Sequence, residues 1–329
     1  DLDLPYVDDL IESYQPAELV AALKPSLVMK LLSGSADAVV YLDPDVLVTR
    51  PFAELDSAWA AGDVVLTPHL LEPVRSKGLA WIERSVLRVG TFNLGFVAVR
   101  RSAEAERLLR WWETHLRHDC RHDPCRGLMR DQRWFDLAPI LFPSIVVSLR
   151  DETYNVGAWN VASRLLSRDD SGDFRVNGRP LTFFHFDGFD PRQPNRFSTP
   201  DEPLIVEPGT PLADLVEVYA RLQFQYGFAV SSAWPFGYDM LDTGAFANGI
   251  AVPAIMSETY RSLSPLERTR FGDPRRTDDP GSFFAWATSP RPGERRLSPV
   301  LERIYRRRID IIAAYPDPTG ADGAPFTVS

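Results

Sequence analysis

The sequence has few cysteines, no long apolar run and no recognisable leader. Cys120 and Cys125 are the only cysteines, too few for a disulfide framework, which favours a reducing compartment such as the cytoplasm. No stretch approaches the roughly 18 uninterrupted apolar residues of a transmembrane helix. The first residues carry neither a basic start nor an apolar core, so no signal peptide is predicted. We therefore expect a cytoplasmic protein. Because an initiating methionine is also absent, we expect the true N-terminus to be missing from this sequence.

Lysine is scarce as well, although arginine is not. Lys24, Lys30 and Lys77 are the only lysines, and the formal net charge is −9 at pH 7. With no basic stripe to offset the acidic excess, nucleic acid is not an expected partner. The rest of the composition is ordinary for a globular protein, 44% hydrophobic and 25% charged, and 329 residues are enough for two domains.

Strand and helix patterns alternate through the first part of the chain. The expected strands are 38–42, 63–68, 92–100 and 144–149, and the expected helices are 18–33, 102–116 and 129–141, with 78–90 either a helix or a loop. The uninterrupted apolar run at 38–42 is typical of a strand covered on both faces in a parallel sheet. Ser102 is a suitable N-cap, and Asn177-Gly178 between two extended runs predicts a hairpin.

The composition changes after about residue 190, where a polar, proline-rich segment leads into helical periodicity. The helices expected there are 211–228, 252–271, 281–287 and 297–314. We therefore predict an α/β domain over 1–195 and a mainly α-helical C-terminal region over 196–329.

Two aspartates stand at the end of the first predicted strand, in AVVYLDPDVLV (38–48). Pro44 disfavours helical backbone at Asp43, so Asp43 and Asp45 are expected on one side of an extended segment. Neighbouring carboxylates repel each other unless a cation lies between them, and Mg²⁺ or Mn²⁺ bound also to phosphate would fill that role. The alternative is an Asp-Pro turn between two strands, with both carboxylates solvated.

Several motifs occur in a familiar order. They are LKPSLVMKLL (23–32), AVVYLDPDVLV (38–48), TFNLGFVAV (91–99), DQRWFDL (131–137) and FFHFDGF (183–189). Over about residues 15–190 this order resembles the retaining glycosyltransferases of the GT-A fold. The closest type is family 8, which includes the glycogenins and the galactosyltransferases of lipooligosaccharide synthesis. Residues 200–329 resemble, more loosely, the helical segments that follow such domains in large bacterial multidomain glycosyltransferases.

The resemblance implies a metal centre. It makes Asp43 and Asp45 the D-x-D pair that holds Mn²⁺ or Mg²⁺ on the diphosphate of a nucleotide sugar, with His185 as the third protein ligand. The ordinary explanation for His185 is a half-buried ring at a strand end. The metal interpretation requires the imidazole to lie within roughly 10 Å of the two carboxylates.

The same resemblance assigns further residues to donor and acceptor. The residues expected on the donor side are Lys24, Asp43, Asn93, Gly95 and Gly188. Asp131 and Gln132 are expected to be catalytic, with Asp131 on donor hydroxyls and the Gln132 carbonyl on the face opposite the leaving group. Tyr154, Asn155 and Trp159 are expected on the acceptor side. Simpler explanations exist for several of them: a helix cap for Asp131, a turn residue for Asn93 and a solvated helix lysine for Lys24.

The implied activity is transfer of a hexose from a UDP-sugar to a saccharide acceptor, with retention, in bacterial surface polysaccharide synthesis. Only about 17 residues precede the first helix, so the GT-A domain is expected to lack its first β-α-β unit. This favours an alternative, a non-catalytic, degenerate glycosyltransferase-like scaffold or binding module beside other glycosyltransferase domains of one parent chain. A sugar nucleotidyltransferase is a further rival, although no glycine-rich phosphate loop is visible.

Two other segments suggest sites of lower specificity. HDCRHDPC (118–125) holds four residues that can bind zinc, at spacings that match no common zinc motif, so a polar loop is the simpler interpretation. RIYRRRIDII (303–312) is a basic amphipathic helix. It either packs on the rest of the chain or contacts anionic lipid headgroups, which would place the protein peripherally at the inner membrane face.

Overall fold

The computed structural model describes residues 2–11, 14–75, 80–198, 203–234, 256, 259–260, 262–274, 276–277, 279–290, 297–307 and 312. The chain divides into two compact units. The first consists of residues 1–2 and 20–234, and the second of residues 3–19 and 235–329.

The core of the first unit is a four-stranded mixed sheet. Its strands are, in spatial order, β1 (Ala38–Leu42), β4 (Phe92–Arg100), β3 (Val64–Pro68) and β7 (Val146–Ser148). All four predicted strands are present, and β3 and β4 are buried along almost their whole length. The prediction that residues 38–42 form a strand covered on both faces in a parallel sheet is wrong. Strand β1 pairs antiparallel to β4 and is only half-buried. An apolar run indicates burial but not strand direction, and among the described strands β1 lies at the sheet edge.

A second, three-stranded sheet joins distant parts of the chain. Its order is β2 (Val46–Val48), β12 (Phe183–His185) and β8 (Val156–Gly157). Strand β12 runs antiparallel to β2, with His185 opposite Val46, and parallel to β8, with His185 opposite Gly157. This register places the end of β12 directly beside the segment that connects β1 to β2.

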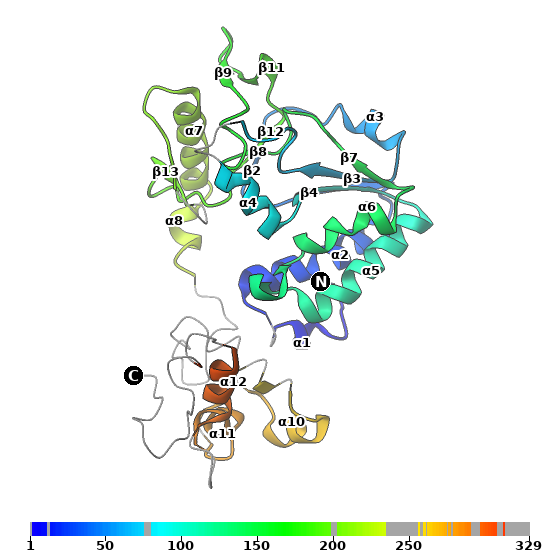
Figure 1. Ribbon diagram of the computed structural model, residues 1–329, viewed down its shortest axis with the longest axis vertical. Helices are drawn as coiled ribbons and strands as arrows, with labels where there is room; N and C mark the ends of the chain where they lie inside the picture. The colour runs from blue at the N-terminus through cyan, green and yellow to red at the C-terminus, as the bar shows by residue number, and fades with distance from the viewer. Residues whose placement is uncertain are drawn as a thin grey trace. The chain divides into compact units, whose positions relative to one another are not determined.

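Helices flank the first sheet. In Figure 1, α2 (Pro16–Ser33), α5 (Ala103–Asp119) and α6 (Ala138–Leu141) lie on the same side of it. The Ser102 side chain accepts a hydrogen bond from the Ala105 amide and caps α5 as predicted. Helix α2 continues through Pro25. Residues 80–89 form the helix α4 (Ala80–Val89), and α3 (Leu55–Trp59) follows β2.

The helix predicted over 129–141 is wrong in part. The structure has instead a 3₁₀ turn, η3 (Gln132–Asp136), and then the short helix α6. Pro139 lies in the first turn of α6 and has no amide hydrogen, so it cannot extend a helix from the preceding residues.

Short strands that pair antiparallel with their neighbours in sequence complete the first unit. These elements are β5 (His122–Asp123), η2 (Pro124–Arg126), β6 (Leu128–Met129), β9 (Leu166–Arg168), β10 (Phe174–Val176), β11 (Arg179–Pro180), β13 (Arg196–Phe197) and β14 (Leu204–Ile205). The predicted hairpin is confirmed between β10 and β11, where Asn177 and Gly178 both have positive φ, of 50° and 81°.

Helix α7 (Pro211–Gln225) packs within the first unit, and α8 (Phe228–Ser231) follows it. Leu215, Val216 and Tyr219 of α7 join a core cluster with Phe184 and Phe186, and the rings of Phe186 and Tyr219 stack with centroids 3.7 Å apart. A functional domain boundary at residue 195 stays a prediction. Helix α7, which follows residue 195, packs against residues that precede it, such as Phe184 and Phe186.

The described part of the second unit is helical. Its elements are α1 (Val7–Ile11), α10 (Pro265–Phe271), α11 (Phe283–Thr288) and α12 (Pro299–Arg307). Met256, Tyr260, Phe283, Ala287 and Val300 form its core cluster. Ser264 and Glu267 cap α10 reciprocally. The single helix predicted over 252–271 is wrong in part, because residues 262–264 form a turn and bend before α10 begins at Pro265. Residues 252–255, 257–258 and 261 of that segment, and residues 308–311 of the basic segment, lie outside the described residues. In the part of the chain that is described, no helix combines the length and apolarity needed to cross a bilayer.

Candidate metal centre

Asp43 and Asp45 lie on a tight turn between β1 and β2. The Val46 amide donates to the Asp43 carbonyl over 3.2 Å, so Asp43, Pro44 and Asp45 are not the extended segment predicted. Proline fixes its own φ at a value that suits a turn, and this local preference prevails. The backbone is therefore the Asp-Pro turn of the alternative interpretation, although its side chains are not simply solvated.

His185 reaches this turn through strand pairing. Its Nε2 lies 3.1 Å from Asp45 Oδ1, and the Phe186 amide donates to the Asp45 carbonyl over 2.8 Å. One potential ligand atom from each of Asp43, Asp45 and His185 lies within 4.8 Å of the other two. The predicted meeting of the three side chains, across about 140 residues of sequence, is present in the structure.

The pair of Asp45 and His185 is electrostatically coupled. Burial works against the charged form of each group, but the hydrogen bond and attraction between them prevail. As a result the pKa of Asp45 is lowered and the pKa of His185 is raised.

Gly95 lies against His185. The Asp43 amide donates to the Gly95 carbonyl over 2.9 Å, which continues the pairing of β1 with β4. A Cβ on Gly95 would stand 2.2 Å from His185 Cε1. The imidazole therefore leaves room only for a glycine here. This reason is different from the donor-side role that was predicted for Gly95.

Lys24 is not a solvated helix lysine. It is 6% exposed, and its Nζ lies 3.0 Å from Asp43 Oδ1, 2.9 Å from Asp131 Oδ2 and 3.2 Å from the Leu94 carbonyl. Burial favours the neutral amine, but the carboxylates of Asp131 and Asp43 outweigh it and raise the pKa of Lys24. Asp43 also accepts from the Tyr41 hydroxyl over 2.9 Å. Lys24 thus connects Asp131 to the aspartate pair, and the Asp131 side chain makes no capping hydrogen bond to η3.

Gln132 is held by backbone groups. Its Oε1 accepts from the Leu94 amide over 3.2 Å, and its Nε2 donates to the Val89 carbonyl over 2.8 Å. Asn93 is buried, and its Oδ1 accepts from the Gly95 amide over 3.0 Å. These contacts fix the orientation of both side chains.

Gly188 is needed for a close approach of two chain segments. It has φ of +77°, and a Cβ there would stand 2.0 Å from the carbonyl oxygen of Ser198. The Ser198 amide donates to the Gly188 carbonyl over 2.8 Å. This contact explains the glycine without a ligand, and its predicted place near a diphosphate stays a prediction.

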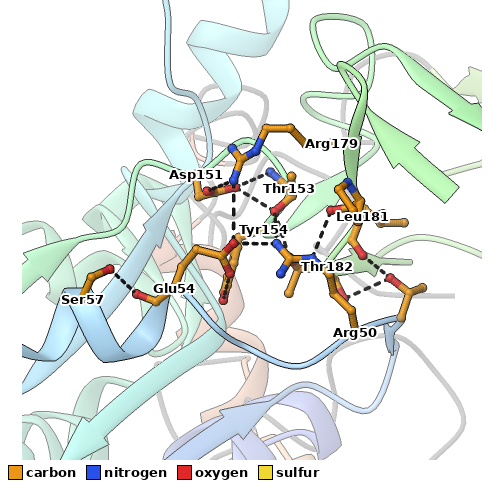
Figure 2. A network of polar contacts seen from close by, with 11 residues as sticks. Arg50, Glu54, Ser57, Asp151, Thr153, Tyr154, Arg179, Leu181 and Thr182 are labelled. Atoms are coloured by element: carbon orange, nitrogen blue, oxygen red, sulfur yellow. Dashed lines mark hydrogen bonds and ion pairs between the residues drawn. The ribbon is translucent and has the colours of Figure 1, made fainter.

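Tyr154 belongs to a polar network at the side of the second sheet. Figure 2 shows it with Glu54, Arg50, Asp151 and Arg179. The Tyr154 hydroxyl donates to Glu54 over 2.8 Å, and Arg50 donates to the same carboxylate over 2.7 Å. Burial opposes ionisation of Glu54, but these two hydrogen bonds prevail and lower its pKa. Tyr154 is 1% exposed, so the structure supplies a structural role for it.

Trp159 lies beside His185 of the candidate metal site. Its ring meets His185 and His69 edge-on, at centroid distances of 5.3 and 5.5 Å. It lines a cavity of about 350 Å³, whose other lining residues are Leu70, Glu72, Pro73, Val74, Arg75, Ile82, Asn160, Ala162 and Ser163. The indole Nε1 is buried and has no hydrogen-bond partner among the described residues.

Asn155, the third residue expected on the acceptor side, is fully buried. Its side chain contacts His185, Asn93 and Thr67. Thr67 and His69, which lie in this same buried region, were missed by the sequence analysis. The available signal was weak: both are polar residues at or just after the end of a predicted strand.

The zinc interpretation of 118–125 receives no support from the described residues. Among them the metal-capable group is Asp43, Asp45 and His185, and the side chain of Cys125 lies outside what is described. Cys120 is buried.

Comparisons with known proteins are sparse. No family model matches the chain. The uncharacterized protein YfnF of Bacillus subtilis (strain 168) is 24% identical over 189 residues. These residues are 55% of this chain, and the chain spans 59% of that relative's length. A crystal structure of mouse xyloside xylosyltransferase 1 in its apo form is 18% identical and covers 55% of this chain and 69% of its own, with a TM-score of 0.32. A superposition that loose does not assign a fold.

Proposed function

We propose that this chain is the catalytic module of a metal-dependent, retaining glycosyltransferase of the GT-A type that resembles family 8. It moves a hexose from a UDP-sugar to a saccharide acceptor in bacterial surface polysaccharide synthesis. The observation that carries the proposal is the convergence of Asp43, Asp45 and His185, with donor atoms within 4.8 Å of one another. The resemblance based on the order of the sequence motifs assigns the same three residues as metal ligands.

The donor set suits Mn²⁺ or Mg²⁺. Carboxylate oxygens are the ligands that hard divalent cations prefer, and an imidazole beside them is well suited to Mn²⁺. Asp45 faces His185, while the hydrogen bond of Tyr41 and the ion pair of Lys24 both hold Asp43 through Oδ1. Asp43, Asp45 and His185 would hold the ion, which supplies positive charge for the diphosphate as it leaves.

Buried groups around the ion orient the donor. Lys24, fixed between Asp43 and Asp131, adds a permanent positive charge next to the predicted diphosphate site. Asp131 and the carbonyl oxygen of Gln132 are assigned to the sugar. Gln132 enters this role already oriented, because its amide is bound to the backbone on both sides. Asn93, Gly95 and Gly188 complete the donor side.

The reaction exchanges one bond at the anomeric carbon. The bond to the diphosphate oxygen breaks, the acceptor hydroxyl oxygen attacks from the same face, and its proton passes to the departing phosphate oxygen. No strong protein nucleophile is required by this route.

The acceptor is assigned to the cavity beside Trp159. An indole next to His185 offers a flat surface for a sugar ring. Glu72 and Arg75 at the cavity add polar groups that suit a saccharide. Further glycosyltransferase domains of one parent chain are proposed partners. The proposed localisation is cytoplasmic, with peripheral attachment at the inner membrane face as an alternative.

Two measurements on one preparation test the proposal. Calorimetry with UDP should give binding that depends on Mn²⁺, and a panel of UDP-sugars should contain one that is turned over in the presence of Mn²⁺ and saccharide acceptors. Asp45→Ala should abolish both signals, whereas Asp170→Ala, at an exposed aspartate, should change neither. Unchanged turnover in Asp45→Ala would reject the assignment. UDP binding without turnover of any UDP-sugar would favour the scaffold alternative.

A further inference from the structure

Four buried side chains form a continuous series of hydrogen bonds that ends at the candidate metal ligand His185. They are His69, Asn93, Asn155 and His185, and each is at most 7% exposed. Successive contacts join Asn93 Nδ2 to His69 Nε2 at 3.4 Å, Asn155 Nδ2 to Asn93 Oδ1 at 3.1 Å, and His185 Nδ1 to Asn155 Oδ1 at 3.3 Å. The roles assigned above use His185 as a ligand and Asn93 on the donor side, and they leave His69 and Asn155 without one.

Backbone groups fix the orientation of every amide in it. The Gly95 amide can only donate, so the atom of Asn93 that it meets at 3.0 Å must be the carbonyl Oδ1. Asn93 Oδ1 then accepts from Asn155 as well, which turns the Nδ2 of Asn155 toward Asn93. Thr67 Oγ1, 2.7 Å from the same Nδ2, is a second acceptor. The Oδ1 of Asn155 is therefore the atom that faces His185.

The other end of the series is closed in the same way. The Thr91 carbonyl can only accept, and it lies 3.3 Å from His69 Nδ1, so that nitrogen carries the hydrogen. His69 Nε2 is then an acceptor, as the donating Nδ2 of Asn93 requires. Burial lowers the pKa of His69 to about 4, which agrees with a neutral ring.

The consequence for His185 follows from its two nitrogens. Both nitrogens face an oxygen that accepts, Nδ1 the Asn155 amide oxygen at 3.3 Å and Nε2 the Asp45 carboxylate oxygen at 3.1 Å, but only Nε2 lies beside another candidate metal ligand. We propose that Asn155 is a positioning residue that keeps a hydrogen on Nδ1 of His185, so that Nε2 is the atom that binds the ion. This inference rests on the proposed function, and it gives Asn155 a role different from contact with the acceptor. A ligating histidine whose second nitrogen is held this way is oriented before the ion arrives.

The backbone of Asn155 decides which variant can test this. Its φ is +52°, in the left-handed region, where a larger residue without an amide would add strain. Asn155→Gly removes the side chain and tolerates that φ. Asn177→Gly is the matched control, because Asn177 has φ of +50° and its side chain bonds to Leu165 and Glu152, outside this series of contacts.

The experiment uses the full chain labelled with ¹⁵N-histidine, with His185 signals identified by their loss in His185→Gln. We expect the metal-free protein near neutral pH to show a proton on Nδ1. After addition of Cd²⁺, a diamagnetic probe, Nε2 should couple to the ion while Nδ1 keeps its proton. In Asn155→Gly the affinity for Mn²⁺ should fall by about 10- to 100-fold, and in Asn177→Gly it should not change.

Several results would overturn the inference. An Nδ1 without a proton, an ion bound through Nδ1, or a folded Asn155→Gly variant with wild-type Mn²⁺ affinity would each do so. If Asn155→Gly does not fold, the spectra of the wild-type protein decide alone. Binding of the ion through Nε2 without turnover of any UDP-sugar would refute the proposed function and support this inference. A wild-type chain that binds no ion would refute both.

Discussion

Gly95→Ala tests how closely His185 is held against the strand that carries Asn93 and Gly95. The added Cβ would stand 2.2 Å from His185 Cε1 and 2.7 Å from its Nδ1, where ordinary contacts begin at 3.4 Å. Since Gly95 is not in the left-handed region, the clash is the whole effect. To relieve it the ring must move by about 1 Å, well beyond the roughly 0.2 Å tolerance of metal–ligand distances. The Mn²⁺ affinity should therefore fall at least about tenfold, or about 1.4 kcal/mol.

The same substitution should lower the free energy of unfolding by about 1–3 kcal/mol, as overpacked cores do. Gly62→Ala provides the matched control, because its Cβ would stand 2.4 Å from the Ile145 carbonyl oxygen and 2.8 Å from Val147 Cγ2. It should cost similar stability without loss of Mn²⁺ affinity. Urea unfolding followed by circular dichroism and Mn²⁺ titration by electron paramagnetic resonance measure the two effects. Wild-type Mn²⁺ affinity in Gly95→Ala would refute this reasoning.

Three further perturbations follow from buried polar groups. Lys24→Met leaves the buried carboxylate of Asp131 without its cation and should cost about 3–5 kcal/mol in urea unfolding; a cost below about 1 kcal/mol would contradict the ion cluster. Tyr154→Phe removes the hydroxyl bonded to Glu54 and should cost about 1–2 kcal/mol with no change in Mn²⁺ affinity, and a change there would move Tyr154 into the metal centre. Burial lowers the pKa of His69 from 6.5 to about 4, so between these values the unfolded chain binds a proton that the folded chain does not. Stability should therefore fall by up to about 3 kcal/mol as the pH falls from about 6.5 to 4, and His69→Gln should flatten this dependence in denaturant titrations at several pH values.

Local signals in the sequence predicted local structure well. Ser102 accepts the hydrogen bond expected of an N-cap, and Asn177 and Gly178 make the expected hairpin. Each of these features depends on neighbouring residues, so a short stretch of sequence contains all the information needed. The strand at 92–100 was likewise predicted with its observed bounds.

Features that depend on distant partners were predicted less well. The edge position and antiparallel pairing of 38–42 depend on β4, which a single apolar run does not specify. The helix predicted over 129–141 is divided because Gln132 bonds to Val89 and Leu94, and because Pro139 cannot continue a helix.

The candidate site divides along the same line. The motif order brought Asp43, Asp45 and His185 together correctly, but no pattern indicated that Thr67 and His69 share a buried region with Asn155. Lys24 was expected near the donor, yet its burial between two carboxylates follows only from the packing of α2 against the sheet. Polar residues whose partners are other buried side chains leave little trace in a single sequence.

The most direct test of the central claim is pulsed electron paramagnetic resonance of the Mn²⁺-loaded chain with ¹⁵N-histidine. If Asp43, Asp45 and His185 hold one ion, the spectrum should show coupling to an imidazole nitrogen, and His185→Ala should remove it. Bound Mn²⁺ without nitrogen coupling, or coupling that survives in His185→Ala, would contradict the account.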